Sequence, residues 1–584
     1  MRKLCGSVHV TNPWGVTVKI KKLVVENYRS FKSFEVALES DCTILIGENN
    51  AGKSNVLAAL YANLRANRAV REGAFDAHDF HLASATGIAG DEGPIRLTLT
   101  FREDHEDEWD IELVSLLEQV VNFDPASGLR SIVIRVEATP ATDAVESGYD
   151  WAFLNSDGVP TTPKLLGTLN RLQSLRPLST LDALRDVTRE FSQRSPYFGA
   201  FTRDPQFDDT VREALIKALG EINDQVLAAH AVFGVLKTNL DAGQHVVQST
   251  GTDVAKIEAV PSRISDLLAN TQVSFQSRTG VMLPLERHGS GTQSLSVLSL
   301  FRAYVEAKLL AKGEPLSEPI LCLEEPESHL HPAGVRALWS LIERLPGQSI
   351  VTTHSGDLAG EAPLRCLRRL AFKGGAVVAY RADESAFTAK ELEHLNFYIR
   401  SSRGELLFAN SWLLVEGKSE IILLAGIARA ANVDLFSHGI RVIEHSMHGR
   451  PVPFIKLADQ LGIHWHSLSD DDRDGRDYAD EARSMLNGRA DAEHITLLDH
   501  GKLEEFLCRN GFAAEYLQAV PAARKLEIID PVGSDAYYKK IIELMHKTEK
   551  IPAVLRVCKR INEDPGLLPA LLRNVLDNCI RNSV

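Results

Sequence analysis

The chain has 584 residues, a length that predicts about three or four structural units rather than one. Its 44% hydrophobic and 24% charged residues are typical of a soluble globular protein and exclude the disordered, collagenous and fibrous classes. Lys and Arg number 64 against 78 Asp and Glu, so the net charge is −14, which argues against coating nucleic acid by bulk charge. DNA binding would therefore need a local basic patch or metal ions.

The seven cysteines are scattered and form no CxxC pair, a pattern that fits neither a disulfide framework nor a zinc site and suits a reducing cytosol. No apolar run is long enough to cross a membrane, and the N-terminus lacks the apolar segment of a secretion signal. We therefore expect a cytoplasmic protein without a membrane partner. Residues 1–17 do not join the pattern that follows, and we expect them to be an N-terminal extension.

Residues 18–150 predict an α/β lobe. The stretch from 18 to 30 alternates enough to indicate a strand, and CTILI predicts a second strand that leads through a glycine-containing loop into the helix NVLAALYANL. Ile95–Phe101 and Ser131–Val136 alternate apolar and polar residues, as strands of an antiparallel sheet do.

The loop between the second strand and the helix matches the P-loop pattern G-x-x-x-x-G-K-[ST]. Its glycines let backbone amides wrap the β- and γ-phosphates of ATP at a helix N-terminus. Lys53 would add positive charge, and Ser54 would bind Mg²⁺. The expected nucleotide-binding residues of this loop are Gly47, Asn50, Gly52, Lys53, Ser54 and Asn55.

Residues 151–280 carry apolar residues at steps of three and four and predict a helical insertion, for which we expect a role in dimerisation. Strand signals return at Pro319–Leu323 and Ser349–Thr353, separated by a helical stretch, which is the pattern of a βαβ unit. Residues 281–405 are therefore expected to form the C-terminal lobe of the ATPase, with a domain boundary near residue 405.

Two glutamates follow the strand ILCL directly. A P-loop ATPase needs one carboxylate in the Mg²⁺ shell, here Glu324, and one that orients or deprotonates the attacking water, here Glu325. His354, at the end of the next strand, is expected to reach the γ-phosphate. The alternative is that the carboxylates are merely solvated and the histidine is structural; the P-loop in the same chain favours the functional interpretation.

The turn from His288 to Leu295 opens an apolar helix and predicts a second anion site, with Ser290, Gly291 and Gln293 as nucleotide contacts. This segment resembles the signature motif of ABC-type ATPases, in which one subunit's signature covers the ATP held by the other subunit's P-loop. VENYRSF and LEEPESHLHP likewise resemble the RecF and structural-maintenance branch of that superfamily. The resemblance implies an ATP-sandwich dimer, hence a homodimer or a higher even oligomer.

A separate parallel sheet is expected in residues 406–584. The strand SWLLV ends at Glu416, and Glu420 lies on the same face of a helix that starts there. Asp470 and Asp472 follow another strand and point the same way in extended backbone. Such carboxylates suit Mg²⁺ or Mn²⁺, which can activate water for phosphodiester cleavage. An acidic solvated surface is the alternative, and the buried-looking strand before Glu416 argues against it.

The order E-G-x-x-E and then D-x-D-x-x-G resembles the Toprim domain of topoisomerases, primases and nucleases. Placed after an ABC-type ATPase, it resembles the OLD (overcoming lysogenization defect) nuclease family over residues 18–584. The resemblance implies an ABC/RecF-like head with a helical insertion, a Rossmann-like Toprim α/β domain and C-terminal helices. It also implies a metal ligand at Glu504 or Glu505, and a lysine, Lys550 or Lys547, that stabilises charge on the cleaved phosphate.

The leading hypothesis is an ATP-binding and ATP-hydrolysing DNA endonuclease that uses Mg²⁺ or Mn²⁺, or Ca²⁺ in vitro, and attacks with metal-activated water. The resemblance also implies phage defence or DNA processing and, as in Gabija-type systems, a helicase partner encoded nearby. A second hypothesis is a RecF-like DNA-clamping repair ATPase without nuclease activity, and a third is a topoisomerase-like enzyme, which would need a covalent tyrosine. The intact Toprim carboxylates favour the first.

Overall fold

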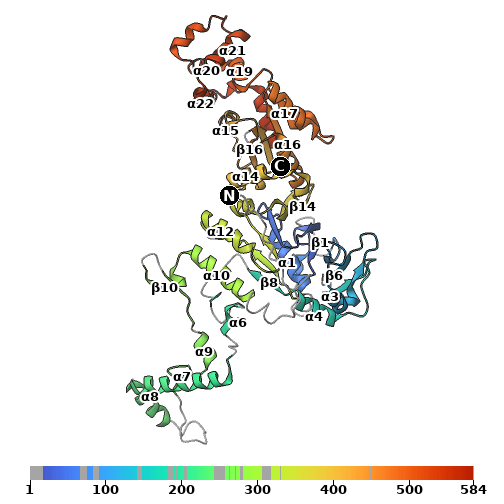
Figure 1. Ribbon diagram of the computed structural model, residues 1–584, viewed down its shortest axis with the longest axis vertical. Helices are drawn as coiled ribbons and strands as arrows, with labels where there is room; N and C mark the ends of the chain where they lie inside the picture. Colours follow the sequence, from blue (N-terminus) through green and yellow to red (C-terminus); the bar gives the residue numbers. More distant parts are fainter. Residues whose placement is uncertain are drawn as a thin grey trace, which may run out of the picture. The chain divides into compact units, whose positions relative to one another are not determined.

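The computed structural model describes most of the chain between residues 18 and 582 (Figure 1). The ranges left out within it are 66–74, 83–90, 141–147, 182–189, 192–194, 196, 203–206, 230, 243–256, 262, 270, 277–279, 306–316, 329 and 447–448. The expected N-terminal extension, residues 1–17, also lies outside the described residues. The chain forms two compact units: a smaller one with Ser174–Gly334 and Arg344–Gly347, and a larger one with Val18–Gln173, Val335–Glu343 and Gln348–Val584.

The larger unit begins with an antiparallel sheet in the order β2-β1-β4-β6-β5, with β7 also paired to β6. Its strands are β1 (Ile20–Tyr28), β2 (Phe31–Ala37), β4 (Ile95–Arg102), β5 (Asn122–Phe123), β6 (Arg130–Thr139) and β7 (Gly148–Leu154). Every second side chain of β4 and β6 is buried, which confirms the strands predicted from their alternation. Helix α3 (Ile111–Leu117) lies between β4 and β5 in the chain.

A second, mostly parallel sheet carries the P-loop in the larger unit. β3 (Cys42–Gly47) is buried along its whole length and pairs in parallel with β12 (Gln348–Thr352) and β13 (Leu367–Lys373). β14 (Ala376–Arg381) adds an antiparallel edge to β13. A strand buried on both faces reads as a continuous apolar run, which explains the sequence CTILIG. Helices α1 (Lys53–Leu64), α12 (Pro332–Ile342), α13 (Gly356–Glu361) and α14 (Ala389–Ser401) complete this region.

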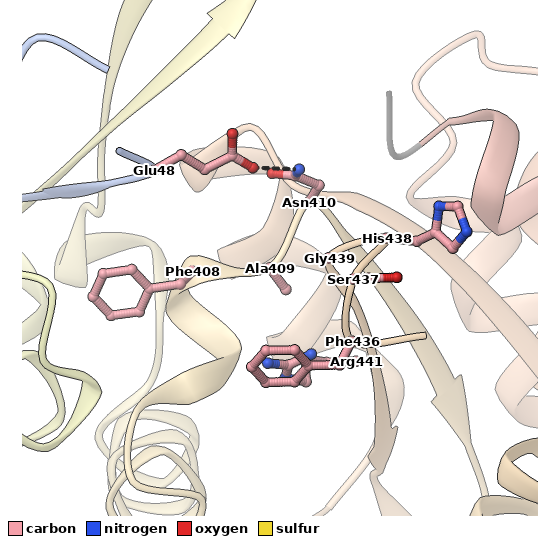
Figure 2. Close-up of a pocket in the computed structure, with 9 residues that line it drawn as sticks. All are labelled: Glu48, Phe408, Ala409, Asn410, Phe436, Ser437, His438, Gly439 and Arg441. Carbon is pink, nitrogen blue, oxygen red and sulfur yellow. Dashed lines mark hydrogen bonds between the residues drawn. The ribbon is translucent and has the colours of Figure 1, made fainter. Parts of the chain in front are cut away.

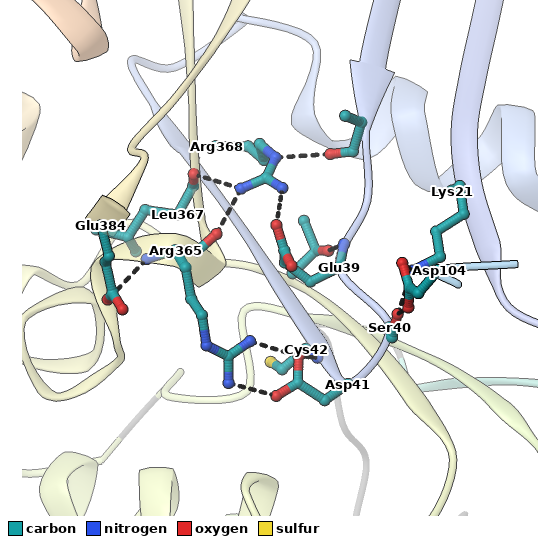
Figure 3. A network of polar contacts seen from close by, with 12 residues as sticks. Lys21, Glu39, Ser40, Asp41, Cys42, Asp104, Arg365, Leu367, Arg368 and Glu384 are labelled. Atoms are coloured by element: carbon teal, nitrogen blue, oxygen red, sulfur yellow. Dashed lines mark hydrogen bonds and ion pairs between the residues drawn. The ribbon is translucent and has the colours of Figure 1, made fainter. Parts of the chain in front are cut away.

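Hydrogen bonds from two arginines connect the segment around β13 to the start of β3 (Figure 3). Arg365 donates two hydrogen bonds to the carboxylate of Asp41, at 2.9 and 2.6 Å. Arg368, which is 1% exposed, donates to Glu39 at 2.5 Å and to the carbonyl oxygen of Ala37 at 2.6 Å. A buried guanidinium is tolerated when its donors are paired, so this network fixes the strand that leads into the P-loop.

The sheet predicted to be Toprim-like, called the Toprim sheet below, lies in the larger unit and has four parallel strands in the order β16-β15-β17-β18. They are β15 (Ser411–Val415), β16 (Ile440–Glu444), β17 (His464–Ser469) and β18 (Ile495–Leu497). Their helices are α15 (Lys418–Ala430), α16 (Pro451–Leu461), α17 (Arg473–Ser484) and α18 (Asp491–His494). This strand–helix alternation confirms the second parallel sheet predicted from the sequence.

C-terminal helices cover one side of the Toprim sheet. They are α19 (Leu503–Leu507), α20 (Ala513–Leu517), α21 (Asp535–Leu544), α22 (Lys550–Glu563) and α23 (Ala570–Arg581). Buried apolar side chains of α15, α19, α21, α22 and α23 form one continuous core with β15. A Cβ on Gly426 of α15 would lie 2.3 Å from the Sγ of Cys558 on α22, so these two helices pack in close contact.

The smaller unit contains helices and a short parallel pair, β8 (Leu178–Leu181) with β11 (Ile320–Glu324). Its other elements are α6 (Phe198–Thr202), α7 (Asp209–Ala229), α8 (Ala231–Ala242), α9 (Ile264–Ala269), α10 (Ser290–Tyr304) and the hairpin β9 (Ser274–Gln276) and β10 (Met282–Pro284). Helix α4 (Leu166–Leu175) leads into it from the larger unit. Helices α7 and α8 occupy the stretch predicted as a helical insertion, whose exact domain boundaries and dimerisation role stay predictions.

Of the helices described, none is both long and apolar enough for a membrane span.

Candidate nucleotide and nuclease sites

The P-loop joins β3 to α1 in the larger unit. Gly52 has a φ of +91°, and a Cβ there would lie 2.5 Å from the ring of Phe31, so glycine is required at this turn. Lys53 is 6% exposed, and its ammonium donates to the carbonyl oxygens of Gly47 and Glu48, both at 2.8 Å. The loop thus places this ammonium at the positive N-terminal end of α1, where phosphate binding is favoured.

The remaining expected nucleotide residues of the loop differ in their surroundings. Ser54 is exposed on the first turn of α1. Asn55 donates to the hydroxyl of Ser30 at 2.9 Å and accepts from Arg29 at 3.3 Å, so it ties α1 to the turn between β1 and β2. Asn50 adopts a left-handed backbone with φ +65°, a conformation that Asn tolerates better than most residues.

His354 follows β12, the parallel neighbour of β3, so the histidine and the P-loop leave the same edge of the sheet. The amide of Thr353 extends this pairing by donating to the carbonyl oxygen of Leu45 at 3.1 Å. His354 itself is exposed. Ser355 then caps α13 by accepting from the amide of Leu358 at 3.3 Å. The fold therefore brings the predicted histidine to the P-loop edge.

In the smaller unit, the two predicted ATPase carboxylates end a strand. β11 finishes at Glu324, and Glu325 follows with a φ of +42°, a left-handed conformation that is uncommon outside glycine. Backbone strain of this kind costs about 1–3 kcal/mol and clusters at functional sites. The next loop is held to α10, because the hydroxyl of Ser294 donates to the carbonyl oxygen of Ser328 at 3.2 Å.

The predicted signature segment opens α10, whose first residues are Ser290 and Gly291. The side-chain amide of Gln293 donates to three carbonyl oxygens in the turn 285–288, at 2.9 to 3.3 Å. This glutamine therefore shapes the turn before the helix, a role that the sequence did not indicate. Its assignment as a nucleotide contact stays a prediction.

Glu416 and Asp470 follow the neighbouring parallel strands β15 and β17 of the Toprim sheet. The Oε1 of Glu416 accepts from the amide of Asp470 at 2.8 Å, and the Oδ1 of Asp470 accepts from the amide of Leu503 at 3.0 Å. A Cβ on Gly475 would lie 2.1 Å from the carbonyl oxygen of Asp470 and 2.6 Å from the Oε1 of Glu416, so glycine is required there. Backbone amides thus hold both carboxylates in place.

Two further carboxylates lie buried at the same edge. Glu420, on the first turn of α15, is 8% exposed, and Glu504, on α19, is 4% exposed. Glu505 is turned to a different partner, since it forms an ion pair with Arg509 at 2.7 Å. Of the two glutamates that the sequence left open, Glu504 is therefore the one in this cluster.

Lys550, the first residue of α22, reaches the cluster from the C-terminal helices. Its ammonium lies 2.7 Å from the Oε1 of Glu504. Its own side chain is 43% exposed, whereas that of Glu504 is 5% exposed, so the lysine bridges the buried carboxylate to the surface. The side chain of Lys547, the other candidate, lies outside the described residues.

Burial and mutual repulsion dominate the electrostatics of this carboxylate cluster, which comprises Glu416, Glu420, Asp470 and Glu504. Burial, followed by repulsion from Glu416 and Glu420, raises the pKa of Asp470 to about 8. Burial also raises the pKa of Glu420 to about 7, with repulsion from Glu504 and Glu416 adding to it. The pKa of Glu416 is raised mainly by burial. Such a set favours any cation that can share its oxygens.

Asp472 stands at the exposed side of the cluster and caps α17. Its Oδ1 accepts from the amide of Gly475 at 2.9 Å, and its Oδ2 lies 3.4 Å from the ammonium of Lys502, whose side chain is 57% exposed. The neighbouring Asp471 instead pairs with Arg476 at 2.7 Å. Lys502 is a residue that the motifs did not single out, and only the folded chain places it next to the D-x-D pair.

The donor set of the cluster consists of carboxylate oxygens, which are the ligands that Mg²⁺ and Mn²⁺ prefer. Among the residues that the structure describes, however, no three His, Cys, Asp or Glu side chains already converge into a metal-holding group. Glu416 and Asp470 are each held by a backbone amide, and Glu504 by a lysine. The chemistry fits a divalent ion, and binding one would require side-chain rotation.

Two family models match the chain, one over its N-terminal part and one over the start of its C-terminal part. A family model described as "Protein of unknown function (DUF2813)" matches residues 19–405, more than half of the chain. The chain belongs to this family. In this DUF2813 member, residues 407–472 match a second model, "Overcoming lysogenization defect protein-like, TOPRIM domain", directly after the first match. The predicted joining of an ATPase head to an OLD-like Toprim domain is thereby confirmed.

Three relatives show how far the likeness extends. The chain is 29% identical to "Uncharacterized protein YbjD" of Escherichia coli strain K12 over 569 residues, 95% of this chain and 98% of the relative. It is 22% identical to the "Old nuclease" of Escherichia phage P2 over 500 residues, 82% of this chain and 81% of the relative. It is 28% identical to the "DNA replication and repair protein RecF" of Anaeromyxobacter dehalogenans over 367 residues, 58% of this chain and 92% of the relative.

Proposed function

We propose that this DUF2813 protein is an ATP-binding and ATP-hydrolysing, divalent-metal-dependent DNA endonuclease that nicks or cleaves DNA by water attack. The observation that carries the proposal is the carboxylate cluster at the carboxyl edge of the Toprim sheet, where burial and repulsion raise the pKa of Asp470 to about 8. Carboxyl pKa values shifted this far cluster at functional sites. The likeness to the phage P2 Old nuclease supports a nucleic acid as the substrate, and the likeness to the DNA replication and repair protein RecF supports DNA.

The residues of the cluster have separable roles in this proposal. Bound Mg²⁺ or Mn²⁺, or Ca²⁺ in vitro, would supply the charge that activates water and stabilises the leaving oxygen. Glu416, Glu420, Asp470 and Glu504 would hold the ion, and the backbone amides on Glu416 and Asp470 keep those two carboxylates oriented. Asp472 joins this set from the exposed side, where a phosphodiester can approach.

Lys550 and Lys502 would act on the DNA phosphate. Lys550 lies 2.7 Å from Glu504 and therefore stands within reach of any group that the cluster binds. It is suited to stabilise negative charge on the cleaved phosphate. Lys502 is more exposed and adjoins Asp472 at 3.4 Å, so it is suited to anchor a neighbouring phosphate of the backbone.

In the ATPase head, the P-loop residues would bind ATP, with Ser54 and Glu324 in the Mg²⁺ shell. Glu325 would orient the attacking water and His354 would contact the γ-phosphate. The signature residues Ser290, Gly291 and Gln293 would cover the ATP of a second copy, so the active form would be a homodimer or a higher even oligomer. The helical insertion would contribute to that dimerisation, and a role in phage defence or DNA processing, with a helicase encoded nearby, is part of the same proposal.

One experiment tests the nuclease assignment directly. Purified protein is incubated with supercoiled and with linear DNA in Mg²⁺, Mn²⁺ or EDTA, with and without ATP. Cleavage by the wild type in metal but not in EDTA, lost in Asp470→Asn, supports the proposal. Asp471→Asn is the matched control, because its carboxylate pairs with Arg476 outside the cluster and the variant should cut normally. Equal cutting by wild type and Asp470→Asn would place the active site elsewhere.

A DNA-clamping ATPase without nuclease activity is the second candidate, and the likeness to RecF over 367 residues favours it. In that case the protein would bind DNA in an ATP-dependent way but leave it uncut in every metal tested. The match to RecF does not extend over the whole chain, since it covers 58% of it, whereas the match to the Old nuclease covers 82%. The nuclease is therefore the better supported of the two.

A further inference from the structure

A hydrogen bond joins the P-loop to the Toprim sheet within the larger unit. The Nδ2 of Asn410 donates to the Oε1 of Glu48 at 2.8 Å, as Figure 2 shows. Glu48 is the second residue of the P-loop motif, and Asn410 directly precedes β15. The side chain of a nucleotide-loop residue thus contacts the strand that ends at the nuclease carboxylate Glu416.

Arg369 holds the other side of Asn410. This arginine is 3% exposed and lies on β13, where it is in register with Ile46, the residue before the P-loop glycine. Its guanidinium donates to the Oδ1 of Asn410 at 2.8 Å and to the carbonyl oxygen of Ala409 at 2.9 Å. The Nη2 of Arg369 therefore orients the Asn410 side chain, with its carbonyl oxygen toward the arginine and its amide nitrogen toward Glu48.

The backbone of Asn410 is part of the Toprim sheet. Its amide donates to the carbonyl oxygen of Gly439, before β16, at 2.8 Å, and its carbonyl oxygen accepts from the amide of His464, at the start of β17, at 2.9 Å. A shift of Asn410 would therefore reach β15 and both of its neighbouring strands. β15 is five residues long, and Glu416 follows it immediately.

Glu48 also contacts Lys53, the lysine to which the proposed function assigns phosphate binding. The ammonium of Lys53 donates to the carbonyl oxygen of Glu48 at 2.8 Å. The β- and γ-phosphates of ATP compete for the same ammonium, so nucleotide binding changes the hydrogen bonding of Glu48. Its main chain would therefore respond to a bound nucleotide, while its side chain is bonded to Asn410.

A cavity of about 350 Å³ lies beside this hydrogen bond and gives the side chains room to rearrange. It is lined by Glu48, Asn410, Phe408, Phe436, His438 and Arg441, with Ala409, Ser437 and Gly439 completing the wall (Figure 2). This hollow is partly open to solvent and Glu48 is exposed, so no tightly packed neighbour on that side opposes a movement of the Glu48 side chain.

From this geometry we propose that Asn410 is the positioning residue through which nucleotide at the P-loop controls the Toprim site. ATP alters the main chain of Glu48, the Glu48–Asn410 hydrogen bond transmits the change, and β15 carries it to Glu416. The effect on DNA cleavage rests on the proposed nuclease function. The coupling between the P-loop and β15 does not require nuclease activity. Reciprocity requires that occupation of the carboxylate cluster change ATP affinity through the same bond.

The test uses full-length protein and two variants of Asn410. Asn410→Ala removes the hydrogen bond to Glu48, and Asn410→Asp places a second carboxylate against it while keeping the side-chain shape. Ser437→Ala is the matched control, since Ser437 lines the same cavity but donates to the carbonyl oxygen of Asp434. Each protein is measured with and without a non-hydrolysable ATP analogue and Mg²⁺.

Two readouts separate the coupling from the nuclease activity. The first is amide hydrogen exchange of residues 411–416, which we expect the analogue to change in the wild type and in Ser437→Ala but not in Asn410→Ala. The second is the ratio of DNA cleavage rates with and without the analogue, which should move from roughly fivefold or more in the wild type toward one in Asn410→Ala. Cleavage without nucleotide should stay within about threefold of the wild type.

Nucleotide-dependent exchange that disappears in Asn410→Ala and in Asn410→Asp supports the coupling even when no DNA is cut, and the absence of cutting then refutes only the nuclease. If the analogue leaves exchange in β15 unchanged in the wild type, or if both Asn410 variants respond as the wild type does, the coupling is refuted although the nuclease stands.

Discussion

Replacing Asp470 with asparagine should stabilise the metal-free protein at alkaline pH. The folded protein raises the pKa of this carboxyl from 3.8 to about 8, so it keeps the proton where the unfolded chain has lost it. Between those values the folded state binds more protons, and stability therefore falls as the pH rises. The asparagine side chain in Asp470→Asn has nearly the same shape, and its Oδ1 can still accept from the amide of Leu503.

The size of this effect on the free energy of unfolding follows from the pKa shift of Asp470. A rise from 3.8 to about 8 is roughly four pH units at about 1.4 kcal/mol each, so ionising Asp470 costs on the order of 5 kcal/mol in the folded protein, as an upper bound. Relaxation and water entry reduce this, and about 2 kcal/mol between pH 6 and pH 8.5 is a realistic expectation. Mg²⁺ should offset the same repulsion, because a ligand that binds only the folded state stabilises it.

Thermal unfolding in EDTA from pH 5 to pH 9 measures this. The Tm of the wild type should fall toward high pH and recover on addition of Mg²⁺, more at pH 8.5 than at pH 6. The Tm of Asp470→Asn should exceed that of the wild type at pH 8.5, depend less on pH and respond less to Mg²⁺. Asp471→Asn, which loses the ion pair with Arg476, should not show this gain. A lower Tm of Asp470→Asn at pH 8.5, or parallel pH curves, would refute the reasoning.

Three further variants test the two sites. Lys53→Ala should abolish ATP hydrolysis while sparing some metal-dependent DNA cleavage, and loss of both with an unchanged circular dichroism spectrum would contradict the separation of the sites. Gly475→Ala should lower cleavage about 100-fold or more, because its Cβ would lie 2.6 Å from the Oε1 of Glu416; near-normal activity would show that this close packing is dispensable. Lys502→Ala should weaken DNA binding and reduce the slope of log affinity against log salt by about 1, with Lys502→Arg restoring it, whereas an unchanged slope would remove Lys502 from the DNA contacts.

The motifs that were predictable from the sequence are local ones. The P-loop, the glutamates after ILCL and the E-G-x-x-E pair each follow an apolar strand, and the D-x-D pair follows a mostly buried one, HWHSLS, so strand signal and chemistry lie in one short segment. Parallel pairing of β15 with β17 then brings the carboxylates of those segments together, as the strand–helix alternation implies. The structure confirms the second parallel sheet that the same reasoning predicted.

Residues whose partners lie far away in the sequence could not be identified from such motifs. Glu504 and Glu505 are adjacent and chemically alike, and only the packing of α19 shows that Glu504 faces the cluster while Glu505 faces Arg509. Lys502 and Arg369 carry no motif, because their partners lie 30 and 41 residues away in the chain. Choosing among such residues requires tertiary distances.

The ion pair between Lys550 and Glu504 joins two candidates for which the OLD-family resemblance implies different roles. While the two side chains are paired with each other, Glu504 cannot use its full charge to bind a divalent ion. Lys550 likewise cannot use its full charge to stabilise the cleaved phosphate. At 2.7 Å, with Glu504 almost fully buried, the lysine neutralises the carboxylate and lowers the cost of its burial. A divalent ion on Glu504 would replace that neutralisation, and the ammonium, half exposed, would then be available to phosphate. Metal binding at Glu504 would in this way release the ammonium of Lys550 to act on the phosphate.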